Sequence, residues 1–416
     1  MSVVNRSKCP VLSGSNQSED PNFNVLTANP DHFFKQLRQE GPVHRVAFED
    51  GFPVWLVTRY DDVIKVLRDP RFTKVPVDQR KTNPDAGQEE EAPIYKLRED
   101  HMLSKDAPDH TRLRTLVQNA FTPRLVQSLR PRIQQIADEL LDKVQHRGKI
   151  ELVEEFSYPL PISVISELLG LPVKDREKVK QWSADLVTIH VSDGNRNVTE
   201  IASTHFVAYL KEAFDYRRAN PGDDLISEML RQRDQGDSLT DEELYAMIFL
   251  LLIAGHETTA HLISNSIFTL LTNPEQLELL QQEPQLIGAA VEEMLRHSGP
   301  VLTSSMRRAL VDVEVDGVTI PAGDGVLVVI ASANMDENKF HEPETFDIRR
   351  TDNRHITFGY GAHFCLGAAL ARMEAEIAIG TLLERLPDLQ FDPEVDVLEW
   401  RSNILIRGLK KLPLIF

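Results

Sequence analysis

The sequence predicts a mainly α-helical protein with a minor β component. Two observations carry this prediction. Helical periodicity dominates from about residue 108 to residue 300, whereas apolar alternation bounded by turn residues is confined to segments nearer the two ends. No internal repeat and no linker between two regimes of composition is visible, so one domain is expected over 25–416. A polar, mobile tail is expected over 1–24.

The N-terminal part is expected to mix helices and strands. A helix over 31–41 precedes a hairpin with strands at 43–48 and 53–59, because these two segments alternate or are rich in β-branched residues. A second helix covers 60–69 and ends before a proline. Residues 76–100 are polar and acidic with three prolines, which predicts a long loop. Loops of this length are usually functional lids or disordered.

The central region contains the longest predicted helix. A shorter helix at 163–172 ends at Gly170 and a proline, and a turn follows at 220–226. The long helix begins at Thr240, where Thr240-Asp241-Glu242-Glu243 fits a capping box, and runs to residue 273, roughly 45–50 Å.

Strands return near the C-terminus. Residues 313–320 contain Asp316-Gly317, a strong hairpin signal, and 325–334 continues as strand. A helix is expected over 368–386, and the segment 403–416 is expected to end in a strand.

Charge and cysteine content limit the classes of function. Lys+Arg number 46 against 64 Asp+Glu, a net charge of −18, which argues against nucleic acid or an anionic membrane as the general partner. The two cysteines, Cys9 and Cys365, do not suggest a disulfide framework. Neither a signal peptide nor an apolar run of about 18 residues is visible, so we expect a cytoplasmic protein without a membrane anchor.

Cys365 lies in an unusually constrained segment, FGYGAHFCLG (358–367). Glycine permits close backbone approach and positive φ, and a helix should begin at or just after the cysteine. A helix dipole gives about 0.3–1 kcal/mol, less than the roughly 2 kcal/mol needed to make the thiol ionise below pH 7. A bound metal would deprotonate it outright. The segment therefore favours a sulfur presented to iron over a cysteine that acts as a small buried hydrophobe.

A second motif, AGHETT (254–259), interrupts the apolar face of the long helix. Ala254 and Gly255 leave a notch for a flat cofactor or dioxygen, while Glu257 and Thr258 add an acid and a hydroxyl; the alternative is a solvated turn. Two other motifs fail on spacing. His256 and His261 point about 140° apart on a helix and do not form a zinc H-E-x-x-H pair. The segment GYGAHF lacks the third glycine of a nucleotide-binding loop.

The segment around Cys365 resembles the signature of the cytochrome P-450 family, F-x-x-G-x-x-x-C-x-G, at Phe358, Gly361, Cys365 and Gly367. Four motifs occur in the family's order along the chain: HTRLR, AGHETT, EMLR and FGYGAHFCLG. The resemblance extends from about residue 30 to the C-terminus. The resemblance implies a single-domain P-450 fold, an α-helical bundle with small β-sheets around a buried haem b. It implies Cys365 as the axial ligand of the haem iron.

The resemblance also implies roles for other residues. Glu257 and Thr258 would supply protons for oxygen activation. Glu293 and Arg296, three apart on one helix face, would form a structural pair with a third arginine. Relatives often carry that arginine where this chain has Thr345, which leaves Arg349 or Arg350 as candidates. Four cationic residues would anchor the haem propionates: His110, Arg114, Arg307 and His363.

The substrate and the partners are implied only broadly. By family position, the pocket should be lined by 76–100, by the region around 170–230, and by 301–304 and 403–405. From the last two ranges we single out Val301, Leu302, Thr303 and Ile404, and we add Ala254 of the AGHETT segment. Their mixed apolar character suits a medium or large hydrophobic molecule. No flavin or NAD domain is visible, so electrons should come from a ferredoxin or flavodoxin with an NAD(P)H reductase. Docking cations for that donor would be Arg112, Arg354 and Arg372. A monomeric monooxygenase is expected; a peroxide-driven enzyme and a non-catalytic haem sensor are the alternatives.

Overall fold

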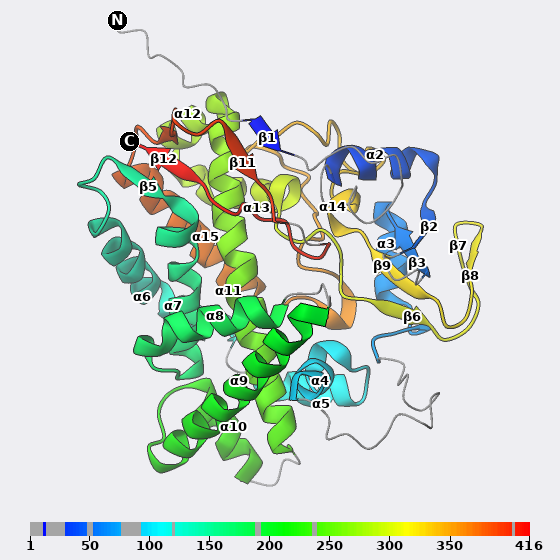
Figure 1. The fold of residues 1–416 in the computed structure, drawn as a ribbon. Coiled ribbons are helices and arrows are strands. Elements are labelled where there is room, and N and C mark those ends of the chain that lie inside the picture. The colour runs from blue at the N-terminus through cyan, green and yellow to red at the C-terminus, as the bar shows by residue number, and fades with distance from the viewer. Residues whose placement is uncertain are drawn as a thin grey trace, which may run out of the picture. The chain divides into compact units, whose positions relative to one another are not determined.

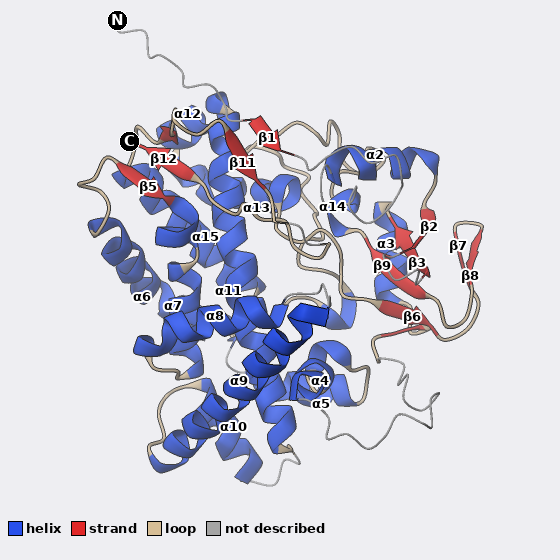
Figure 2. Ribbon diagram, viewed as in Figure 1, coloured by secondary structure: helices blue, strands red, loops and turns tan. Residues whose placement is uncertain are grey.

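Helices dominate the chain, and its strands form small sheets (Figures 1 and 2). The computed structural model describes residues 11–13, 30–47, 53–75, 93–118, 121–187, 193–234, 239–401 and 404–416. They divide into two compact units. The first unit comprises Met1–Thr73, Gln127–Leu160 and Thr258–Phe416, and the second comprises Lys74–Val126 and Pro161–Glu257.

A five-stranded sheet organises one part of the first unit. Strand β3 pairs antiparallel with β2, which confirms the predicted N-terminal hairpin, and parallel with β9. The order across the sheet is β2-β3-β9-β6-β4. These strands are β2 (Val43–Ala47), β3 (Pro53–Val57), β4 (Phe72–Thr73), β6 (Arg307–Ala309) and β9 (Gly325–Val328).

Both faces of this sheet are buried. Successive side chains of a strand point to opposite faces, and in β3 Leu56 joins one apolar cluster while Val57 joins another. The Leu56 cluster includes side chains of α2 (Pro30–Glu40), and the Val57 cluster includes side chains of α3 (Tyr60–Arg68). The two helices begin and end within a residue or two of the predicted bounds.

The remaining strands pair in three smaller sheets. The predicted Asp316-Gly317 hairpin is present, with φ values of 46° and 82° at its two turn residues. Of the predicted tail 1–24, only Val11–Ser13 is described, and it pairs with β11, so the domain boundary at residue 25 stays a prediction. The strands are β1 (Val11–Ser13) and β11 (Val397–Glu399), β7 (Val313–Val315) and β8 (Val318–Ile320), and β10 (Gln390–Phe391), β12 (Pro413–Ile415) and β5 (Lys149–Glu151).

One C-terminal strand was predicted too long. The strand expected over 325–334 ends at Val328, and Ile330–Ala333 forms the short helix α14. The strand expected at the end of 403–416 is confirmed as β12, at Pro413–Ile415. The other helices that lie wholly or mostly in the first unit are α6 (Pro123–Asp142), α12 (Pro274–Gln282), α13 (Ile287–Ser298) and α15 (Ala368–Arg385).

Helices are the secondary-structure elements of the second unit within its described residues. Pro93–Glu99 forms α4, which corrects the C-terminal end of the loop predicted over 76–100; residues 76–92 lie outside the described part of the chain. Gly170 ends α7 with a φ of 87°, as its position in the sequence predicts. The helices are α4, α5 (Asp109–Gln118), α7 (Pro159–Leu169), α8 (Arg176–Val187), α9 (Asp193–Ala219) and α10 (Leu225–Asp234).

The long helix α11 covers Asp241–Thr272, as predicted. Its capping box is formed in both directions: the Glu243 amide donates to Thr240 Oγ1 and the Thr240 amide donates to the Glu243 carboxylate, each at 3.1 Å. Among the described helices it alone is long and apolar enough to cross a membrane. However, 78% of its most apolar 18-residue window is buried inside the protein.

Candidate active site

The Cys365 side chain is exposed, in a loop whose backbone is held from within. The Cys365 amide donates to the Phe358 carbonyl at 2.9 Å. Gly359 and Gly361 have φ values of 74° and 77°, in the left-handed region that favours glycine. Helix α15 begins at Ala368, so the cysteine precedes the first helical turn instead of starting it.

The signature glycines differ in what they do. A Cβ on Gly361 would lie 3.3 Å from the Leu67 carbonyl oxygen, so both its φ and its neighbour require glycine. Gly367 has a φ of −85°, and no described protein atom lies within 4 Å of a Cβ built on it. The backbone conformation itself favours glycine at Gly361 and at Gly359, which is not a signature position.

Two of the four predicted propionate anchors belong to the first unit. Arg307 lies in β6, is 4% exposed, and donates from Nη1 to Ser304 Oγ at 3.2 Å. His363 is half-buried in the 3-10 turn Gly361–His363, two residues before the cysteine. The position of each is compatible with the predicted role, which stays a prediction.

The other two anchors lie in α5 of the second unit. His110 is buried and Arg114, one turn later, is half-buried. Burial lowers the pKa of His110, and the nearby Arg114 lowers it further. Arg112, between them in sequence, forms an ion pair with Glu243 of α11 instead.

The AGHETT segment lies in the middle of α11, and its residues face different surroundings. A Cβ on Gly255 would lie 3.1 Å from Ile165 of α7, so this glycine makes room for a neighbouring helix. Ala254 is exposed, Glu257 is 8% exposed and Thr258 is half-buried. The predicted notch at Ala254 and Gly255 stays a prediction.

His256 is a residue of this segment to which the sequence assigned no role. Its Nδ1 lies 2.7 Å from the Leu252 carbonyl and its Nε2 lies 3.2 Å from Ser183 Oγ of α8. Because a carbonyl only accepts, Nδ1 carries the proton and Nε2 accepts from the serine hydroxyl. Burial lowers the pKa of His256 to about 4, which keeps the ring neutral. Ala254 and Thr258 each lie about 160° around the helix from His256, on the opposite face.

The predicted Glu293–Arg296 pair is fully buried and bidentate. Arg296 donates from Nε and Nη2 to the two carboxylate oxygens of Glu293 at 2.8 and 2.7 Å, and both side chains are 0% exposed. Arg350 is the third arginine of the network, at 3.2 Å from Glu293. Arg349 pairs with Glu283. The carbonyl of Thr345 accepts from both Arg296 and Arg350, at 3.2 and 3.0 Å.

The predicted pocket residues of the first unit lie close together. Thr303 Oγ1 donates to the Ile404 carbonyl at 3.1 Å, and Val301 forms a β-bridge with Ile406. Leu302 and Ile404 belong to the apolar cluster of the five-stranded sheet. Their side chains thus serve the core, and their assignment to a substrate pocket stays a prediction.

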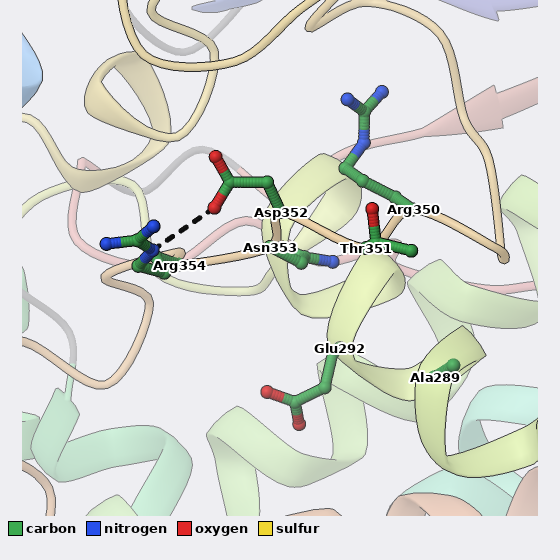
Figure 3. A pocket seen from close by; sticks show the side chains of 7 residues that line it. All are labelled: Ala289, Glu292, Arg350, Thr351, Asp352, Asn353 and Arg354. Atoms are coloured by element: carbon green, nitrogen blue, oxygen red, sulfur yellow. Dashed lines mark hydrogen bonds and ion pairs between the residues drawn. The ribbon is translucent and has the colours of Figure 1, made fainter.

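The first unit has a hollow of about 570 Å³, which the sequence did not predict. Figure 3 shows the side chains that line it. Glu292 of α13 lies on one side of it, and the Asp352–Arg354 ion pair, 3.1 Å long, lies on another. Its lining comprises Ala289, Glu292, Arg350, Thr351, Asp352, Asn353 and Arg354.

The chain is similar to known proteins over nearly its whole length. A family model described as cytochrome P450 matches residues 194–407. Cytochrome P450 107B1 of Saccharopolyspora erythraea is 45% identical over 393 residues, which cover 91% of this chain and 93% of that protein. Polyketide biosynthesis cytochrome P450 PksS of Bacillus subtilis is 42% identical over 394 residues, 92% and 95% of the two chains.

Solved structures agree with the sequence relatives. The crystal structure of the myxobacterial cytochrome P450 CYP267B1 matches with a TM-score of 0.87 and 42% identity, covering 94% of this chain and 97% of that one. The similarity confirms the predicted fold class, a mainly helical single-domain fold with small sheets, and the predicted enzyme class, an oxidoreductase. The chain belongs to the cytochrome P450 family.

Proposed function

We propose that this protein is a haem-thiolate monooxygenase that inserts one oxygen atom of O2 into a hydrophobic small molecule. The observation that carries the proposal is the exposed Cys365 side chain, in a loop held by the Phe358 carbonyl and two left-handed glycines. A thiolate is the axial ligand that suits oxygen activation at haem iron.

The residues of the loop fit this group. Cys365 would bind the iron of haem b, and His363 and Arg307 of the same unit would pair with propionate carboxylates, as would His110 and Arg114. A haem bound in this way supplies the oxygen-activating chemistry. The protein supplies orientation, proton delivery and exclusion of water.

Proton delivery is assigned to Glu257 and Thr258. The Glu257 carboxyl lies in a largely buried position, where it can hold a proton for transfer. Thr258, half-buried on the helix face that it shares with Ala254, would pass the proton from its hydroxyl. An acid next to a hydroxyl favours a dioxygen-dependent enzyme over a peroxide-driven one, which does not need the relay.

The relatives favour a medium or large hydrophobic substrate. CYP267B1 was crystallised with myristic acid, CYP109E1 of Bacillus megaterium with testosterone, and P450BioI with an acyl carrier protein that carries hexadec-9Z-enoic acid. We expect the substrate to be an acyl chain, terpenoid, steroid or macrolide. Electrons would arrive in the cytoplasm from a ferredoxin or flavodoxin with its NAD(P)H reductase.

Carbon monoxide binding to the reduced protein tests the iron–sulfur bond. The wild type and Cys9→Ser should both show the red-shifted absorption band of sulfur-ligated haem, and Cys365→Ser should lose it. A wild type without that band, or without bound haem, would overturn the proposal. Substrate-dependent consumption of NAD(P)H with formation of a hydroxylated product then separates a monooxygenase from a haem sensor, which shows neither.

A further inference from the structure

We propose that Glu292, Arg372 and His355 form a positioning cluster for the Cys365 loop, which acts through the ring of Phe358. The inference rests on the proposed role of Cys365 as iron ligand. It also assigns Arg372, which the sequence suggested as a docking cation for an electron donor, to a different task.

The centre of the cluster is the carboxylate of Glu292 on α13. Arg372 of α15 donates to it from Nε at 2.5 Å and from Nη2 at 2.9 Å, a bidentate arrangement. His355 Nε2 lies 3.2 Å from the same carboxylate, and its side chain is 2% exposed. Burial alone would raise the pKa of Glu292, but the bonds from His355 and Arg372 hold it at about 2. The carboxylate therefore stays ionised throughout the neutral range.

Two members of the cluster contact Phe358 directly. The Arg372 guanidinium lies 4.4 Å from the centroid of the Phe358 ring, within range for a cation–π interaction. The ring of His355 lies 6.0 Å from that of Phe358, tilted by 47°. Because the Phe358 carbonyl accepts the Cys365 amide at 2.9 Å, one residue connects the cluster to the sulfur-bearing residue.

The chain just before Phe358 is held by other bonds. Thr357 Oγ1 donates to the Leu295 carbonyl at 2.7 Å, and Asn334 accepts the Ile356 amide at 2.9 Å. These bonds fix the backbone of residues 356 and 357 without touching the Phe358 ring. The Phe358 ring itself lies beside the side chains of Arg372, His355 and Phe364, and the first two of these belong to the cluster.

The Arg372 guanidinium already forms an ion pair with the Glu292 carboxylate. Both side chains are 33% exposed, and Glu292 borders the hollow of Figure 3. Arg354 at the same hollow is 77% exposed, and its partner Asp352 is 64% exposed. A docking cation is expected to resemble Arg354 more than Arg372, which is bidentate and stacked on a ring.

The test compares Arg372→Gln, Glu292→Gln and a matched control in the haem-loaded protein. The control is Glu376→Gln on the same helix, α15. It breaks the 3.1 Å ion pair between Glu376 and Arg130 of α6, and neither of these two residues is bonded to Phe358. For each protein we would measure how fast the reduced carbon monoxide complex loses its red-shifted band under mild denaturant. If a substitution lowers the free-energy barrier to loss of the iron–sulfur bond by about 1 kcal/mol, the band should disappear about fivefold faster.

The two cluster variants separate positioning from electrostatics. Arg372→Gln removes a cation and Glu292→Gln removes an anion, so a direct effect of charge on the haem would have opposite signs in the two. A positioning role predicts faster loss in both, no change in Glu376→Gln, and a double variant no worse than the more affected single one. Arg372→Lys should recover only part of the stability, because lysine lacks the planar fork.

Three results would overturn the inference: wild-type persistence of the band in Arg372→Gln, effects of opposite sign, or an equal effect in the control. In each of these cases the wild type still shows the red-shifted band. Failure of the proposed function would instead appear as absence of the band from the wild type, so the two failures are distinguishable.

Discussion

Glu374 on α15 should make the protein less stable as the pH rises. Its side chain is 1% exposed, and its Oε2 has no hydrogen-bond partner among the described residues. Burial raises the pKa of this carboxyl well above 4.5, because an ionised carboxylate without a partner is costly inside a protein. The native protein therefore keeps the proton that the unfolded chain releases.

The sign and the slope follow from proton linkage. Between the pKa of the unfolded chain and the raised pKa of the native state, the native state binds one proton more than the unfolded chain. The free energy of unfolding then falls by about 1.4 kcal/mol for each pH unit of increase across this window. Glu374→Gln binds no proton in either state, so its stability relative to the wild type should rise with pH by the same slope.

The assay is urea unfolding of both haem-loaded proteins, followed by tryptophan fluorescence, at pH steps from 5 to 8. Glu384→Gln, an exposed glutamate of the same helix, reports the general effect of a Glu→Gln change. The reasoning predicts that Glu374→Gln gains on the wild type as the pH rises, while Glu384→Gln does not. A difference that stays flat with pH, or one that shrinks, would refute a protonated Glu374.

Three further predictions concern the network and the long helix. Arg296→Met should lower the free energy of unfolding in urea by about 3–5 kcal/mol, because it leaves a buried carboxylate without its bidentate partner, and Arg350→Met by clearly less. Equal losses of unfolding free energy in the two variants would contradict the conclusion that Arg296 is the main partner of the Glu293 carboxylate. Ser183→Ala should cost about 1–2 kcal/mol in the same assay, since it removes the donor to buried His256, and Ser183→Thr should restore it. Thr258→Ala should consume NAD(P)H and release peroxide instead of product; fully coupled turnover would remove Thr258 from the proton relay.

Several features were predictable because they depend on residues close together in the chain. The capping box at Thr240 and Glu243 and the turn at Asp316-Gly317 each involve at most four residues, and both formed as predicted. The Cys365 segment is similarly local, because its glycines and the helix that follows define the loop. The end of β9 at Val328 was not predictable in this way, because it depends on where the pairing of this strand with β3 ends.

Glu374 shows a signal that sequence reasoning could have used. It lies four residues after Leu370 and three before Ile377, so it shares a helix face with apolar side chains. That pattern predicts a buried carboxyl, but a single glutamate on an apolar face does not reveal whether a partner reaches it from another segment. Only the packing of the other elements shows that no described residue does.

The sequence by itself determined the family, the cysteine that would bind iron and the helix that carries the acid–hydroxyl pair. Each of these can be recognised from a short motif of neighbouring residues. The tertiary structure decided which arginine completes the Glu293 network and which carboxylate pairs with Arg372. Arg350 reaches Glu293 across 57 residues and Arg372 reaches Glu292 across 80. Ion pairs over such separations are set by how helices and loops pack, and no local pattern distinguishes Arg350 from its neighbour Arg349.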